Sequence, residues 1–254
     1  MRKMVTIVID GRDVTALEET SLLKVLLREG FDIPHLCFHE KVTAYASCRL
    51  CLVEVEAGGA RRIATSCNYP VVDGLKVHVD TEAVLADRAT VFEVLLAQAP
   101  DSEKLRAYAS RYGVTETTYP LQEGACILCG LCERVCSDVI GAGAIGFLGR
   151  GGRKELGTPY GEASPTCIGC GACAYVCPTG CITVVDSERD MVREIPYIHA
   201  CHELLPCRLC GRPVSTKAHV EYLRRKGLDE VSITTCDECK KRGYARLVAF
   251  QGHM

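Results

Sequence analysis

The chain has 254 residues, of which 48% are hydrophobic and 24% are charged, and its formal net charge is −2 at pH 7. A chain of this length allows one or two ordinary domains. Because it is nearly neutral and contains no apolar run of 18 residues, neither nucleic-acid binding nor a transmembrane helix is expected.

Cysteine is the unusual feature of the composition, with 18 residues. Secreted proteins use many cysteines for disulfides, whereas cytosolic proteins use them for metals. Pairs of the form C-x2-C recur along the chain, and two cysteines this close chelate one metal centre more easily than they bridge each other. The N-terminus also lacks the apolar stretch and cleavage site of a secretory signal. These observations favour metal binding and a cytoplasmic location.

The first elements predicted in chain order are two strands and a helix. Residues 4–10 alternate and are rich in β-branched side chains, which predicts a strand, and Asp10-Gly11 predicts a turn into a second strand. A helix with a leucine-rich face then begins at a cap provided by Thr20 and ends at Gly30.

Further strands are expected at residues 52–56, 62–64 and 75–79, with a glycine turn between the first two. Strands around a single helix within about 80 residues indicate a small α+β, grasp-like domain over residues 1–80.

The first candidate metal site lies in this domain. Its cysteines are spaced C-x10-C-x2-C-x15-C: Cys37, Cys48, Cys51 and Cys67. A [2Fe–2S] cluster needs four thiolates, and the small neighbours Ala46 and Ser47 would allow backbone N–H groups to approach the sulfurs. A structural zinc site is the alternative.

A helical connector is predicted over residues 81–118. Its apolar side chains repeat at helical spacing: Val84, Leu85, Val91, Phe92, Leu95 and Leu96. Residues 82–125 contain neither cysteine nor histidine.

Two copies of C-x2-C-x2-C-x3-C follow, which form an internal repeat within a predicted domain at residues 119–190. In this motif, three cysteines of each run bind one [4Fe–4S] cubane and the fourth binds the other cubane. The predicted ligands of the first cubane are Cys126, Cys129, Cys132 and Cys177. The predicted ligands of the second cubane are Cys167, Cys170, Cys173 and Cys136. Cys181 is interpreted as a buried apolar cysteine, and the glycine-rich residues 141–152 as a loop without a phosphate-binding pattern.

The tail, residues 191–254, is predicted to be a zinc-ribbon-like module with a charged helix near residues 217–226. Two C-x2-C pairs supply its metal ligands: Cys207, Cys210, Cys236 and Cys239. The alternative to Zn²⁺ is a third [4Fe–4S] cluster, and Cys201 or His202 could also supply a ligand. The other histidines, His253 among them, show no paired spacing and are expected to be structural or exposed.

Two stretches resemble a known group of proteins. Residues 33–56 followed by 64–67 resemble the N-terminal [2Fe–2S] domain of the largest peripheral-arm subunit of respiratory complex I, which also occurs in NAD-linked hydrogenases and some formate dehydrogenases. Residues 134–180 resemble the double-cubane domain of the same group. The resemblance implies a plant-ferredoxin-like β-grasp fold and a bacterial-type 2×[4Fe–4S] ferredoxin domain.

One departure from the group concerns residues 82–125, where its members usually carry a cluster held by one histidine and three cysteines. We expect that cluster to be absent here.

The function expected is that of an iron–sulfur electron-transfer subunit without catalytic residues of its own. By resemblance, its partners are a flavin- and NAD(P)-binding iron–sulfur subunit and a catalytic subunit, which could be a hydrogenase, a formate dehydrogenase or a disulfide-reductase-type flavoprotein. Electron bifurcation in such a complex is left open. The alternatives are a catalytic iron-only hydrogenase, disfavoured because few residues follow the cubane motifs, and a nucleic-acid-binding tail.

Overall fold

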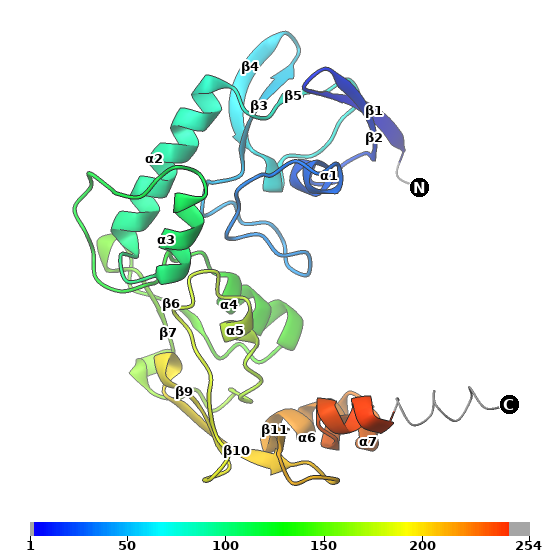
Figure 1. Cartoon of the computed structure of the whole chain (residues 1–254), viewed down its shortest axis with the longest axis vertical. Coiled ribbons are helices and arrows are strands. Elements are labelled where there is room, and N and C mark those ends of the chain that lie inside the picture. Colours follow the sequence, from blue (N-terminus) through cyan, green and yellow to red (C-terminus); the bar gives the residue numbers. More distant parts are fainter. Residues whose placement is uncertain (1–2, 244–254) are drawn as a thin grey trace, which may run out of the picture. The chain divides into compact units, whose positions relative to one another are not determined.

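The computed structural model describes residues 3–243 and divides the chain into two compact units. The first unit comprises Met1–Leu131 and Cys177–Cys181, and the second comprises Cys132–Val176 and Ile182–Met254. Each combines helices and strands (Figure 1), as the predicted α+β class requires. Residues 244–254, including His253 and the end of the predicted tail module, lie outside the described residues.

A five-stranded sheet with the order β2-β1-β5-β3-β4 organises the first unit. Strands β1 and β5 are parallel, and the other neighbouring pairs are antiparallel. Its strands are β1 (Met4–Ile9), β2 (Arg12–Leu17), β3 (Leu52–Ala57), β4 (Ala60–Thr65) and β5 (Lys76–His78). Val5, Ile7 and Ile9 of β1 are buried, which is the period-two pattern that predicted this strand.

Helix α1 (Leu22–Arg28) packs its buried leucines into the same core as β1. The predicted cap at Thr20 is wrong: the residue at the cap position is Ser21, and its side chain makes no capping hydrogen bond. Gly30 follows the helix with φ +85°, a left-handed conformation that suits glycine.

The connector forms two helices, α2 (Glu82–Gln98) and α3 (Glu103–Ser110), and each is capped by a hydroxyl side chain. The predicted apolar face is correct except at Leu85, which is 50% exposed. Phe92 is fully buried and stacks on Tyr112 with ring centroids 5.2 Å apart, which joins α2 to the segment after α3.

The second unit begins with short helical turns and a small hairpin. These elements are α4 (Leu131–Arg134), a π-helical turn (Val135–Ile140), β6 (Gly146–Leu148), β7 (Glu155–Gly157) and α5 (Ala172–Tyr175). The glycine-rich stretch predicted as a loop therefore contains a strand, β6. At Gly149 a Cβ atom would lie 2.3 Å from the Arg153 carbonyl oxygen, so the hairpin needs glycine there.

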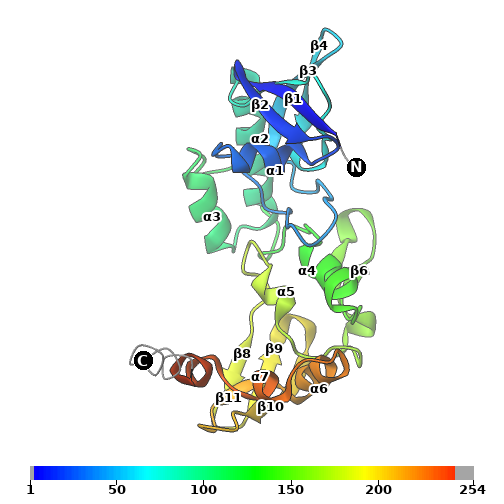
Figure 2. The ribbon, with the colours of Figure 1, turned by 90° about the vertical axis from the view of Figure 1, so that its right-hand side faces the viewer.

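The rest of the second unit is a four-stranded antiparallel sheet with the order β11-β10-β9-β8, together with two helices (Figure 2). Its elements are β8 (Val185–Ser187), β9 (Val192–Ile195), β10 (Ala200–Pro206), β11 (Pro213–Thr216), α6 (Lys217–Arg225) and α7 (Glu230–Thr234). Helix α6 confirms the helix predicted near residues 217–226. Across residues 3–243, no helix combines the length and the apolar character needed to cross a membrane.

Candidate metal centres

The four N-terminal cysteines come together in the first unit, and each is at most 3% exposed. Cys37 lies in the loop after α1, Cys48 and Cys51 lie in the loop before β3, and Cys67 lies just after β4. The N–H of Cys48 donates to Cys37 Sγ at 3.4 Å. This contact fits the expectation that the small residues before Cys48 allow backbone N–H groups to reach a sulfur.

Hydrogen bonds among these thiols shift their pKa values in opposite directions. Bonds from Cys48 and Cys67 hold the pKa of Cys37 far below its ordinary value, and they raise the pKa of both partners far above it. The bond from Cys67 lowers the pKa of Cys51 to about 7. These hydrogen bonds link all four thiols into one group, which fits a centre held by four thiolates.

Side-chain hydrogen bonds fix the backbone carbonyls of this site. Ser66 Oγ donates to the Cys51 carbonyl at 2.8 Å, and Ser21 Oγ donates to the Cys67 carbonyl at 2.8 Å. Ser21 is thus used to hold a cysteine loop rather than to cap α1.

Arg88 on α2 is a residue of this site that the sequence did not reveal. It is 4% exposed, and its guanidinium donates to the carbonyls of Leu52 (2.7 Å) and Val79 (3.0 Å) and to Asp80 Oδ1 (2.7 Å). Leu52 directly follows Cys51, so Arg88 ties the connector to the strand that leaves the cysteine loop. The signal in the sequence was the position of Arg88, which lies four residues from both Val84 and Phe92 on the apolar face of α2.

The N-terminal cysteine loop also contacts the first C-x2-C run. Ser47 Oγ donates to the Cys129 carbonyl at 3.0 Å. Burial raises the pKa of Cys129 to about 12, and the nearby charges of Cys126, Cys177 and Cys37 add to the rise. Cysteines of both predicted sites therefore lie close together in the first unit.

The segment that carries Cys177 is held by the connector helix α3. Ser102, which caps this helix, donates its Oγ hydrogen to the Thr179 carbonyl at 2.8 Å. In the first run, the N–H of Leu128 donates to Cys126 Sγ at 3.4 Å. Cys132, the remaining residue of the predicted first-cubane set, belongs to the second unit.

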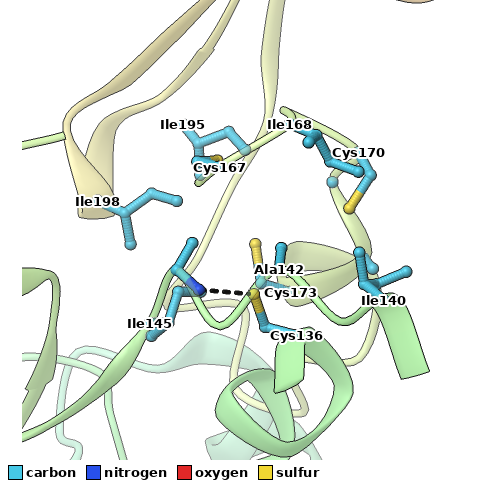
Figure 3. Close-up of a pocket in the computed structure, with 13 residues that line it drawn as sticks. Cys136, Ile140, Ala142, Ile145, Cys167, Ile168, Cys170, Cys173, Ile195 and Ile198 are labelled. Carbon is cyan, nitrogen blue, oxygen red and sulfur yellow. Dashed lines mark hydrogen bonds between the residues drawn. The ribbon is translucent and has the colours of Figure 1, made fainter. Parts of the chain in front are cut away.

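A second group of four cysteines surrounds an apolar cavity in the second unit (Figure 3). It combines the last cysteine of the first run with the first three of the second run, which is the grouping that the crossover motif predicts: Cys136, Cys167, Cys170 and Cys173. The N–H of Ala144 donates to Cys136 Sγ at 3.3 Å. Burial raises the pKa of Cys173 to about 12.

Isoleucines, alanines and one glycine complete the lining of this cavity, and the isoleucines come from both the motif region and the tail. Ile140 and Ile145 contribute from the residues between the two runs, and Ile195 and Ile198 contribute from β9 and the turn after it. An apolar lining excludes water and therefore fits a buried cluster that is held only by thiolates and backbone N–H groups.

The four tail cysteines form a tighter group. All four Sγ atoms of Cys207, Cys210, Cys236 and Cys239 lie within 4.8 Å of one another, and the Cys210 and Cys236 sulfurs are 3.6 Å apart. The N–H of Cys236 donates to Cys207 Sγ at 3.3 Å and is the main reason why the Cys207 pKa falls to about 6. Gly211, which follows the first pair, has φ +79°, a left-handed conformation that allows a tight turn there.

The other candidate residues from the sequence lie elsewhere. Cys201 is exposed, and neither Cys201 nor His202 belongs to the tail group. His202 Nε2 is buried with no hydrogen-bond partner among the residues of the described structure. Near the first site, His35 pairs with the Ile33 carbonyl and His39 accepts from the Lys41 N–H, so both rings contact backbone.

Comparison with known families identifies two domains in the chain. Residues 2–82 match the 2Fe-2S iron–sulfur cluster binding domain, and residues 125–181 match the 4Fe-4S dicluster domain. Both matches agree with the predicted positions of the cysteine sites.

Curated relatives are subunits of oxidoreductases. The chain is 31% identical over 265 residues to the NADPH-Fe(3+) oxidoreductase subunit alpha of Geobacter sulfurreducens, covering 94% of this chain and 30% of the relative. It is 32% identical over 224 residues to the NADP-reducing hydrogenase subunit HndD of Solidesulfovibrio fructosivorans, covering 76% and 37%. It is 30% identical over 206 residues to the mitochondrial NADH-ubiquinone oxidoreductase 78 kDa subunit of Candida albicans, covering 70% and 28%. The chain thus spans about a third of the length of these relatives.

A solved structure is also similar: a chain of an NAD+-reducing [NiFe]-hydrogenase in the H2-reduced state. The match has a TM-score of 0.52 and 27% identity, and it covers 82% of this chain and 88% of the other. The expected resemblance to complex I and hydrogenase subunits is confirmed.

Proposed function

Since this chain carries a 2Fe-2S iron–sulfur cluster binding domain and a 4Fe-4S dicluster domain, we propose that it is an electron-transfer subunit of a multi-subunit oxidoreductase. It relays single electrons between a flavin- and NAD(P)-binding subunit and a catalytic subunit. The names of the relatives, which include NADPH, NADP and NADH, support an NAD(P)-linked complex. A cytoplasmic location suits the proposal, because a reducing compartment keeps ligand thiols from forming disulfides.

The observation that carries the proposal is the contact between Ser47 and the Cys129 carbonyl. A one-electron relay needs neighbouring centres, and this bond joins the loop of one predicted cluster to the ligand run of the next. The absence of cysteine and histidine from residues 82–125 means that these residues supply no histidine-ligated cluster.

We assign the [2Fe–2S] cluster to Cys37, Cys48, Cys51 and Cys67, in a β-grasp domain over residues 1–80. The connector at residues 81–118 and the domain at residues 119–190 follow. We assign one cubane to Cys126, Cys129, Cys132 and Cys177, and the other to Cys136, Cys167, Cys170 and Cys173. These clusters would supply reversible one-electron chemistry, while the chain fixes their positions and excludes water.

For the tail we propose a structural Zn²⁺ at Cys207, Cys210, Cys236 and Cys239, in a zinc-ribbon-like module over residues 191–254. Tetrahedral ligation at the usual Zn–S distance places sulfurs about 3.8 Å apart, close to the 3.6 Å between Cys210 and Cys236. The ligands of a cubane sit on four different irons and must lie farther apart. In the described part of the chain, this is the only group of three or more His, Cys, Asp or Glu side chains compact enough for one ion.

Metal analysis of the anaerobically purified chain tests these assignments. About ten irons, a matching amount of sulfide and one zinc are expected, from one [2Fe–2S] and two [4Fe–4S] clusters. About fourteen irons without zinc would contradict the zinc assignment and favour a third cubane. Zinc without sulfide would contradict the electron-transfer function.

Two cysteine substitutions test the ligand assignment of the second cubane. Cys173→Ala should remove about four irons, because Cys173 lines the cavity of the second group. Cys181→Ala is the matched control and should keep all of the iron, since Cys181 is not a predicted ligand. Equal loss in both variants would contradict the ligand assignment.

A further inference from the structure

The loop that carries Cys167 and Cys170 is covered by strands of the tail. Gly169 lies between these cysteines, and a Cβ atom there would be 2.7 Å from the His202 ring and from the Thr216 methyl group. The Thr216 hydroxyl also donates to the Ile168 carbonyl. The tail therefore packs directly against the ligand loop, and only glycine permits an approach this close.

Arg193 on β9 brings a positive charge to the same loop. Its Nη1 donates to the Gly169 carbonyl at 3.1 Å, while Nε and Nη2 bind the two carboxylate oxygens of Asp186 on β8 at 2.7 and 2.8 Å. The Arg193 side chain is 15% exposed. Three hydrogen bonds fix the orientation of the guanidinium, and burial reduces the screening of its charge by salt.

We propose that Arg193 is a positioning residue that raises the reduction potential of the cluster held by Cys136, Cys167, Cys170 and Cys173, and that Asp186 moderates this effect. The inference rests on the proposed function, because it assumes a cubane at these cysteines. Reduction adds one electron and hence one negative charge to the cluster, so a fixed cation nearby stabilises the reduced state more than the oxidised state.

The experiment is a potentiometric titration of the full chain, reduced stepwise with dithionite and followed by electron paramagnetic resonance. The signal of this cluster is the one that Cys173→Ala removes. In Arg193→Gln the ratio of reduced to oxidised cluster at a fixed potential should fall about tenfold, which for one electron is a shift of about 59 mV to lower potential. In Asp186→Asn the ratio should rise about threefold, because Arg193 loses its counter-ion.

Three further variants separate charge from packing. Arg193→Lys keeps the charge and should retain most of the wild-type potential. Thr216→Val removes an uncharged hydrogen bond from the same loop and should shift the ratio by less than about twofold. Arg224→Gln removes an arginine that pairs with Glu221 and Glu230 at the surface of the same unit. It should leave the ratio of reduced to oxidised cluster unchanged.

Several outcomes would overturn the inference. These are an unchanged ratio in Arg193→Gln, a fall in Asp186→Asn, or an equal shift in Thr216→Val. If Arg193→Gln does not fold, the direction of the Asp186→Asn shift decides alone. Iron and sulfide content is measured first: a chain that binds no clusters refutes the proposed function itself, whereas clusters with unaltered potentials refute only the role of Arg193.

Discussion

The four cysteines of the N-terminal unit and the four cysteines of the tail are held in place by different means. The N-terminal four are at most 3% exposed, and two of them, Cys51 and Cys67, belong to an apolar core that includes residues of β1, α1 and β3. In the tail, Cys207 is buried, Cys210 is exposed, and Cys236 and Cys239 are intermediate.

The elements around the tail cysteines are short and polar. Helix α7 has five residues, and among the residues of α6 only Val220 is buried. Exposed ion pairs such as Arg212–Glu238 and Arg224–Glu230 surround them, and such pairs add little stability. From this comparison we expect that the N-terminal site is a cradle formed by a folded domain, whereas the tail depends on the proposed metal for its fold.

Removal of the tail metal should have the largest effect. Structural zinc commonly contributes on the order of 10 kcal/mol to folding, so a chelator should unfold β10, β11 and α6. Hydrogen exchange should then show loss of amide protection there by at least about a hundredfold, while protection of β1 to β5 stays unchanged. If the tail keeps its amide protection without metal, its fold does not depend on the metal and the proposed difference between the two sites is wrong.

Cys51→Ser should remove the [2Fe–2S] signal while the N-terminal sheet stays folded. The cluster loses a ligand, whereas the apolar core loses one sulfur atom among the many buried side chains that it contains besides Cys51. Electron paramagnetic resonance of the reduced chain reports the cluster, and hydrogen exchange reports the sheet. Unfolding of the sheet in this variant would show that the N-terminal site also depends on its metal.

Arg88→Met should destabilise the first unit by about 2–4 kcal/mol, because it leaves the buried carbonyls of Leu52 and Val79 without their donors. Denaturant unfolding measures the change. Arg62→Met is the matched control, since Arg62 contacts the Tyr69 hydroxyl at the surface, and it should change stability by less than about 0.5 kcal/mol. Equal effects would mean that Arg88 does not anchor the cradle.

Ser47→Ala should have the smallest effect, about 1 kcal/mol, since it removes one side-chain hydrogen bond. If the contact with the Cys129 carbonyl also couples the two centres, electron equilibration between them should slow in rapid-mixing experiments. Ser110→Ala loses a local bond to the Ala107 carbonyl and should leave that rate unchanged. If electron equilibration slowed in both variants, the rate would not depend on the contact between Ser47 and the Cys129 carbonyl.

The sequence alone determined the features that depend on local spacing. A C-x2-C pair brings two thiols together whatever surrounds it, so the tail group and the crossover grouping at Cys136 could be predicted from the cysteine pattern. Alternating and helical periodicity predicted β1 and α2 for the same reason, because these patterns follow from the geometry of a single element.

Only the tertiary structure decided with which distant groups the polar side chains form hydrogen bonds. Ser21 and Ser47 look like ordinary loop residues, yet one holds the Cys67 carbonyl and the other the Cys129 carbonyl. Leu85 fits the apolar face of α2 but stays exposed, because the packing of α2 leaves that position uncovered.

The surroundings of Arg88 and Arg193 were likewise decided by the tertiary structure. A buried guanidinium needs several acceptors that converge on it, and those acceptors come from segments far apart in the chain. Such convergence is a property of the folded backbone, so the sequence determined which cysteines are grouped, and the tertiary structure determined which charges and carbonyls surround them.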